Sequence, residues 1–180
     1  QSGLLLPCWP WPKGGPALVS VGRFQAGVAV LMRRASDGQY LLLKRSEEKD
    51  YGPGTWECVT GRVDQGESLS AALHREVAEE LGDETRVQVD WIIGTTHFYR
   101  GEPSLDTELL GVLFACTLTS TAPLRLSREH SASRWLSAEE ALQEFPPGNW
   151  LHRAIRRAET LRALAPDALL DCFHQQGFEI

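Results

Sequence analysis

The chain has 180 residues, of which 42% are hydrophobic and 23% are charged, and its formal net charge is −6. This balance predicts a single globular domain that is large enough to bury a proper core. The negative charge argues against a nucleic-acid binder held by phosphate contacts, and no apolar run is long enough to cross a membrane. The four cysteines lack the spacing of a zinc site or a redox pair, so we expect reduced thiols in a cytoplasmic protein. They are Cys8, Cys58, Cys116 and Cys172.

The N-terminal stretch differs from the rest in composition. We take residues 1–3 as a cloning remnant, because the chain does not begin with methionine. Residues 4–17 are too rich in proline and glycine for a regular element. Because Trp9 and Trp11 would be costly to expose, we expect this arm to lie against the domain or against the second subunit of a homodimer. Covering the substrate is the alternative role.

The remaining chain alternates between strand and helix patterns. Strands are expected over residues 25–33, 40–44, 56–60, 86–93, 95–100, 108–117 and 131–136. Helices are expected over residues 69–81, 137–145 and 150–164, followed by one or two helical turns after Pro166. This order indicates an α/β fold. We therefore expect an N-terminal arm over residues 1–17, one domain over residues 18–165 and a C-terminal tail over residues 166–180.

The stretch from Gly61 to Asp83 contains the most informative helix, GRVDQGESLSAALHREVAEELGD. Ser68 is a suitable N-cap, and Gly82 stands where a left-handed residue would end the helix. At about 100° per residue, four apolar side chains form one stripe that should face a core. They are Leu69, Leu73, Val77 and Leu81.

Three glutamates share an arc of about 100° beside this stripe, and Glu80 lies inside it. Like charges at the spacing of Glu76, Glu79 and Glu80 repel one another, and a buried charge is costlier still. A bound cation would reverse that argument, since clustered carboxylates are what Mg²⁺ or Mn²⁺ selects. The alternative is a solvated acidic helix in which Arg75 and Glu79 form an ordinary ion pair.

The spacing of the whole stretch resembles the Nudix box, GX5EX7REUXEEXGU, in which U is aliphatic. The matching positions are Gly61, Glu67, Arg75, Glu76, Val77, Glu79, Glu80 and Gly82. Asp83 departs from the pattern, at a position that should matter more for packing than for chemistry. The resemblance implies a Nudix hydrolase with a mixed β-sheet sandwiched between α-helices. It covers about residues 22–161.

The resemblance also implies roles for the acids. Glu76 and Glu80 would ligate Mg²⁺ or Mn²⁺, and Glu79 would ligate the metal or help to activate water. Arg75 would hold the acids in place, while Glu67 would be structural or electrostatic. Gly61 would let the backbone approach the site.

Further site residues are expected outside the box. Nudix enzymes often supply another carboxylate from a later loop, and Glu129 is the candidate; the alternative is that it pairs with Arg128. Substrate phosphates could be reached by Lys44 and Arg45, unless they are a solvated pair. Trp56 and Phe98 are candidates to stack a ring, although core packing is the commoner role of aromatics. His74, His97 and His130 rank below the glutamates as bases.

The substrate class is expected partly from resemblance and partly because an acidic helix with a bound metal would hold a polyphosphate chain. The segments WECVTGRVDQGES and EHSASRW are similar to dihydroneopterin triphosphate pyrophosphohydrolases and related nucleoside triphosphate enzymes. We expect a small-molecule phosphoanhydride to be cleaved to a monophosphate and pyrophosphate, without a nucleic-acid or membrane partner. The alternatives are hydrolysis of dinucleoside polyphosphates or ADP-ribose, and a non-catalytic Nudix domain that senses a ligand or binds another protein.

Overall fold

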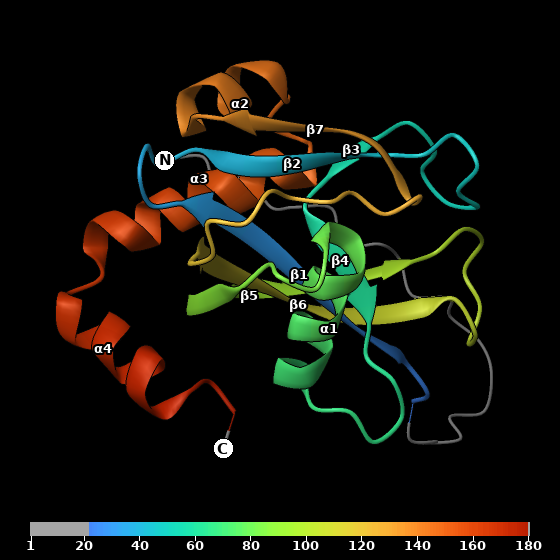
Figure 1. The fold of residues 1–180 in the computed structure, drawn as a ribbon. Coiled ribbons are helices and arrows are strands. Elements are labelled where there is room, and N and C mark those ends of the chain that lie inside the picture. Colours follow the sequence, from blue (N-terminus) through green and yellow to red (C-terminus); the bar gives the residue numbers. More distant parts are fainter. Residues whose placement is uncertain (1–21, 180) are drawn as a thin grey trace, which may run out of the picture.

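A computed structural model describes residues 22–179 of the chain. The N-terminal arm, with Trp9 and Trp11, lies outside the described residues. Seven strands form one sheet with the order β3-β2-β1-β6-β5, while β4 pairs with β1 and β7 pairs with β2 (Figure 1). The strands are β1 (Gln25–Arg34), β2 (Tyr40–Arg45), β3 (Trp56–Glu57), β4 (Val59–Arg62), β5 (Val87–Tyr99), β6 (Glu108–Leu118) and β7 (His130–Leu136). The helices are α1 (Leu69–Leu81), α2 (Ala138–Glu144), α3 (Trp150–Leu164) and α4 (Asp167–Gln176).

The sheet is mixed and has helices on both faces, which confirms the expected α/β architecture. β1 and β6 run parallel along their whole length, and the other pairs are antiparallel. One buried cluster fills the space between the sheet and α1, and the other lies on the face covered by α2 and α3 (Figure 1). No helix among residues 22–179 combines the length and the apolar character needed to span a bilayer.

Helix α1 has the ends and the buried face that its sequence predicts. The Ser68 side chain accepts a hydrogen bond from the backbone N–H of Ala71, and Gly82 follows the helix with a φ of 99°. Leu73, Val77 and Leu81 are buried against the sheet. Glu80 is buried with them, being only 3% exposed.

The predicted strand over residues 56–60 is wrong as a single element. The chain changes neighbours at Cys58: β3 pairs with β2, whereas β4 pairs with β1. This switch places Glu57 and Gly61 on two different strands, and Gly61 then lies against Glu76 of α1.

Two other element boundaries also differ from prediction. Residues 86–93 and 95–100 form one strand, β5, because register shifts between Val89 and Trp91 and between Ile92 and Gly94 absorb the irregularity. A β-carbon at Gly94 would lie 3.3 Å from the Arg157 guanidinium, so this glycine leaves room for a side chain of α3. After Pro166 the chain forms α4, a helix of 10 residues rather than one or two turns.

Candidate active site

The acidic side of α1 faces the backbone of β4. A β-carbon built on Gly61 would lie 1.7 Å from the carboxyl carbon of Glu76, so only glycine leaves room for this carboxylate. The neighbouring backbone N–H of Thr60 donates to Glu80 Oε1 at 3.4 Å. The switch between β3 and β4 therefore brings the strand backbone against two glutamates of the helix.

Glu80 lies at the centre of this arrangement. Its Oε2 atom is buried and has no hydrogen-bond partner among residues 22–179. His130 Nε2 lies 3.8 Å from that oxygen, too far for a hydrogen bond. Burial, followed by the charge of Glu57, raises the pKa of Glu80 to about 9. In the part of the chain that the structure describes, no positively charged side chain lies close enough to the Glu80 carboxylate to stabilise its ionised form.

Arg75 organises the exposed part of the acid cluster. Its Nε and Nη2 atoms donate to the two carboxylate oxygens of Glu67, both at 2.8 Å. Its Nη1 atom donates to Glu76 at 2.8 Å and to Glu79 at 3.4 Å. Bonding to Arg75 lowers the pKa of Glu67 to about 2. Burial raises the pKa of Glu76, and the bond from Arg75 opposes that rise.

Glu57 is a site residue that the sequence interpretation missed. Its carboxylate accepts two bonds from Arg45 Nη1, at 2.8 and 2.9 Å, and one from Thr60 Oγ1 at 3.1 Å. His130 Nε2 lies 3.2 Å from the same carboxylate. One feature of the sequence could have indicated Glu57: it is an acid in a short strand, and the next residues, Cys58 and Val59, are apolar. Buried acids are rare unless they are paired, so an acid at this position suggests a specific partner.

The residues expected outside the box differ in their surroundings. Glu129 pairs with Lys49 rather than Arg128, and this bond lowers the pKa of its carboxyl group. The negative charge of Glu129 contributes to the raised pKa values of Glu76 and Glu80, so Glu129 belongs to the same electrostatic environment.

The two predicted aromatic residues lie in different environments. Phe98 is exposed and stacks on Tyr51, with 6.4 Å between the ring centroids. Trp56 packs against the buried cluster on the α2 and α3 face, and the Arg134 guanidinium lies 5.2 Å from its ring centroid.

The basic residues and the histidines that were considered as site residues have different partners. Arg45 is bound to Glu57, whereas the Lys44 side chain forms no ion pair within residues 22–179. His97 pairs with Glu108 at 2.8 Å, and His74 contacts the Ser70 carbonyl on the exposed side of α1. Only His130, of the three histidines considered as bases, reaches the buried acids.

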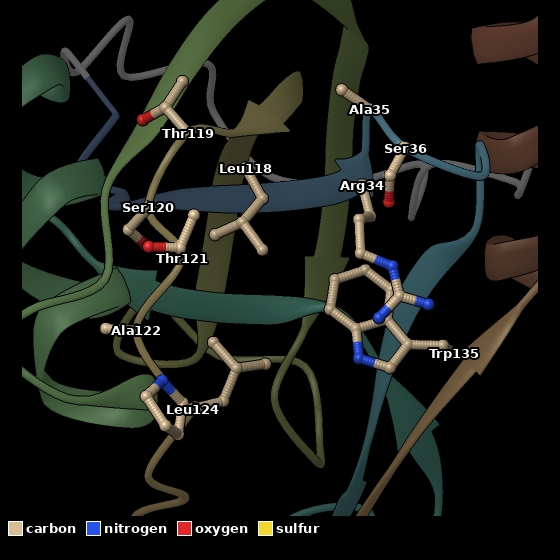
Figure 2. Close-up of a pocket in the computed structure, with 11 residues that line it drawn as sticks. Arg34, Ala35, Ser36, Leu118, Thr119, Ser120, Thr121, Ala122, Leu124 and Trp135 are labelled. Atoms are coloured by element: carbon tan, nitrogen blue, oxygen red, sulfur yellow. The ribbon is translucent and has the colours of Figure 1, made fainter.

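A separate hollow of about 410 Å³ opens at the C-terminal end of β1 (Figure 2). Arg34 and Trp135 line one side of this hollow, and the Arg34 guanidinium lies 4.3 Å from the centroid of the Trp135 ring. Leu118 and Leu124 line other parts of the hollow (Figure 2). Arg34 is already bound to Asp37. None of the acidic residues of α1 lines this hollow, so we do not assign it to the acid site.

The carboxylates provide the donor chemistry of a divalent-metal site. Within residues 22–179, no three acidic, histidine or cysteine side chains already converge as metal ligands. The unpartnered Glu80 oxygen beside Glu76 nevertheless fits a hard cation, which prefers carboxylate oxygens. Binding would require these side chains to turn toward a common point.

Comparison with known proteins settles the family. A family model described as the NUDIX domain matches residues 23–158. The chain belongs to the Nudix family. It is 26% identical over 110 residues to the nucleoside triphosphatase NudI of Escherichia coli, which covers 58% of this chain and 77% of that protein. It is also 33% identical over 133 residues to an octanoyltransferase of Myxococcus xanthus. That match covers 73% of this chain but only 35% of the Myxococcus protein.

Solved structures agree with the Nudix assignment. The MutT protein of Methanosarcina mazei Go1 has a TM-score of 0.61 and 26% identity, covering 81% of this chain and 98% of that one. Two others are similar in fold alone. An Ap4A hydrolase of C. elegans has a TM-score of 0.60 and 20% identity, covering 78% and 99% of the two chains. The dihydroneopterin triphosphate pyrophosphohydrolase of E. coli has a TM-score of 0.57 and 23% identity, covering 79% and 99%. The protein is therefore a Nudix-type hydrolase.

Proposed function

We propose that this Nudix hydrolase cleaves a triphosphate carried on a nucleoside or pterin ring between its α and β phosphates. The products are a monophosphate and pyrophosphate. The buried, unpartnered carboxylate oxygen of Glu80, beside Glu76, is the observation that carries this proposal. A charge in this position is explained best by a divalent cation that binds it together with the phosphates.

The metal ligands in this proposal are Glu76, Glu79 and Glu80. A bound Mg²⁺ or Mn²⁺ would neutralise phosphate charge and make a bound water more acidic. Arg75 holds Glu76 and Glu79 on the same side of α1. The exposed carboxylates of Glu79 and Glu129 are the two candidates to accept the proton of the attacking water.

The ring is proposed to bind at Tyr51 and Phe98. Both rings are exposed and already stack on each other, so an aromatic substrate could stack there too. Arg45 connects this pair to the acids, because its Nε atom donates to the Tyr51 carbonyl and its Nη1 atom donates to Glu57. Trp56 is assigned a packing role on the other buried cluster.

Lys44, which was predicted to reach substrate phosphates, pairs with Trp56 and therefore faces the side of the sheet that α2 and α3 cover, so we assign it no phosphate contact. It follows four buried residues of β2, and its side chain is half-buried without an ion pair among the described residues. Arg45, predicted for the same role, is instead proposed to act by holding Glu57 and the Tyr51 carbonyl.

The products and the metal requirement test the proposal together. Purified protein is incubated with nucleoside triphosphates, dihydroneopterin triphosphate, dinucleoside polyphosphates and ADP-ribose, and the products are separated by chromatography. We expect pyrophosphate and a monophosphate from a triphosphate, no turnover in EDTA, and recovery with Mg²⁺ or Mn²⁺.

Four results would contradict the proposal. Orthophosphate with a diphosphate would place the cleavage at another bond. Preference for a dinucleoside polyphosphate or ADP-ribose would change the substrate class. Undiminished turnover in EDTA would exclude the metal-dependent reaction, and binding without turnover would favour a ligand sensor.

A further inference from the structure

The C-terminal segment that follows α3 returns to α1, the helix that carries the acidic residues. No residue of α4 is buried, and Gly177, which follows this helix, has a φ of 75°. Phe178 then contacts Phe114 with 4.6 Å between the ring centroids. Phe114 is fully buried on the α1 face of the sheet. The tail is therefore attached to the same cluster that supports α1.

Glu179, the next residue, binds the N-terminus of α1. Its Oε1 atom accepts the backbone N–H of Leu69 at 2.7 Å, and its Oε2 atom accepts that of Ser70 at 2.9 Å. These are the first two N–H groups of the helix, which have no partner within it. The N–H of Ser70 is the main group that lowers the pKa of Glu179. Together with the Ser68 cap, Glu179 satisfies the whole first turn.

The first turn is directly connected to the acid cluster. Glu67 lies two residues before Leu69, and its carboxylate accepts hydrogen bonds from Nε and Nη2 of Arg75. Arg75 in turn donates to Glu76, whose carboxylate lies against Gly61. A displacement of the first turn would therefore move the acceptor that orients Arg75.

We infer that Glu179 is a positioning residue of the active site. By fixing the first turn of α1 it holds Glu67, and through Arg75 it holds the carboxylate of Glu76. The kinetic test of this role rests on the proposed hydrolysis, whereas the contact of Glu179 with α1 can be tested without any substrate. Glu179 reaches the reaction only through the helix and is not a catalytic residue.

Amide hydrogen exchange tests the contact by itself. The Leu69 and Ser70 amides should exchange slowly in the wild-type protein, although first-turn amides of a helix ordinarily lack protection. Glu179→Ala should accelerate both by about tenfold, the size expected for loss of a capping interaction. Phe178→Ala should act in the same direction, because it removes the contact that holds the tail. The matched control is Asp171→Asn, an exposed α4 residue, which should change neither rate.

Enzyme kinetics test the positioning role. Glu179→Ala should lower kcat by about three- to tenfold with little change in KM, since it disturbs the metal-binding acids rather than the ring site. In a Glu67→Gln background the same substitution should cost less, because the connection to Arg75 is already weakened. A Kd for Mn²⁺ measured by electron paramagnetic resonance should rise in parallel.

Each possible failure has a defined meaning. Rapid exchange of Leu69 and Ser70 in the wild-type protein, or rates unaffected by Glu179→Ala, would overturn the contact. Unchanged kcat and unchanged Mn²⁺ affinity, or fully additive effects with Glu67→Gln, would overturn the positioning role. If no triphosphate is hydrolysed, the proposed function fails, while exchange and Mn²⁺ affinity still decide the role of Glu179.

Discussion

The carboxylate of Glu76 occupies the space where Gly61 would carry a side chain: a β-carbon there would lie 1.7 Å from its carboxyl carbon. The glycine of the box is therefore required by a specific close approach between β4 and α1. Its φ is not positive, so backbone conformation alone does not require glycine at this position.

The substitution Gly61→Ala should displace the Glu76 carboxylate. We expect kcat to fall by at least about tenfold, with little change in the free energy of unfolding, because the atoms that must move are the far end of the flexible Glu76 side chain. Steady-state kinetics and urea unfolding measure the two effects. Gly148→Ala is the matched control, because a β-carbon there would meet nothing within 4 Å and its φ is not positive. Wild-type kcat in Gly61→Ala would exclude the close approach as a catalytic requirement.

Glu80→Gln should separate stability from activity. Without metal, the folded protein keeps the Glu80 proton up to a pKa of about 9, whereas the unfolded chain releases it near pH 4.5. Between these values the folded state binds more protons, so the free energy of unfolding falls as pH rises. The variant lacks this group, and its apo Tm should exceed that of the wild type at pH 8 and match it near pH 4.

The same variant should lose activity by about a hundredfold or more, because it removes an anionic metal ligand. Thermal unfolding from pH 4 to 9 in EDTA compares the stability of the variant with that of the wild type, and kinetics in Mg²⁺ compare their activities. Glu79→Gln on the exposed side of α1 should retain the wild-type dependence of Tm on pH. A Glu80→Gln protein that is less stable at pH 8 yet fully active would identify a structural acid.

Arg75→Lys should weaken catalysis while the charge is retained. A lysine cannot reproduce the two parallel bonds to Glu67 together with those to Glu76 and the Arg62 carbonyl. We expect kcat to fall about 10- to 100-fold with a small change in KM. Arg153→Lys, on an exposed position of α3, is the control and should behave as the wild type. Equal kcat values for both variants would mean that charge alone suffices at position 75.

Phe98→Ala and Tyr51→Ala should weaken substrate binding selectively. Loss of one stacking partner costs about 1–3 kcal/mol per ring, so KM should rise about tenfold while kcat changes little. Ile92→Ala removes an equally exposed apolar side chain from β5 and should leave KM unchanged. A fall in kcat without a rise in KM would place the ring of the substrate elsewhere.

The sequence was informative where local chemistry determines the structure. The Ser68 cap, the apolar stripe and the burial of Glu80 all follow from spacing within one helix, and the structure confirms them. Asp83, the departure from the box, is exposed just beyond the helix, where an aliphatic residue is not needed for packing. The family and the fold class follow from this same stretch.

The remaining site could not be predicted because its contacts are made by distant segments. Glu57 influences the pKa of Glu80 from a separate strand, β3, since the chain changes neighbours at Cys58. Glu179 meets Leu69 across 110 positions of sequence, and periodicity within either segment carries no sign of that contact. The extent of β5 was misjudged for a related reason, since β6 supplies hydrogen bonds that carry the strand across two bulges.

The parallel pairing of β1 with β6 has a consequence for how the protein folds. Residue 25 pairs with residue 109 and residue 34 with residue 118, so β1 gains this neighbour only after most of the domain has been synthesised. Until then one edge of an apolar strand remains open, which invites pairing with other chains. Such distant contacts also slow folding, because a long loop must close before they form. A ribosome-bound chain that ends before residue 108 should therefore depend on chaperones, whereas release of the whole domain should end that dependence.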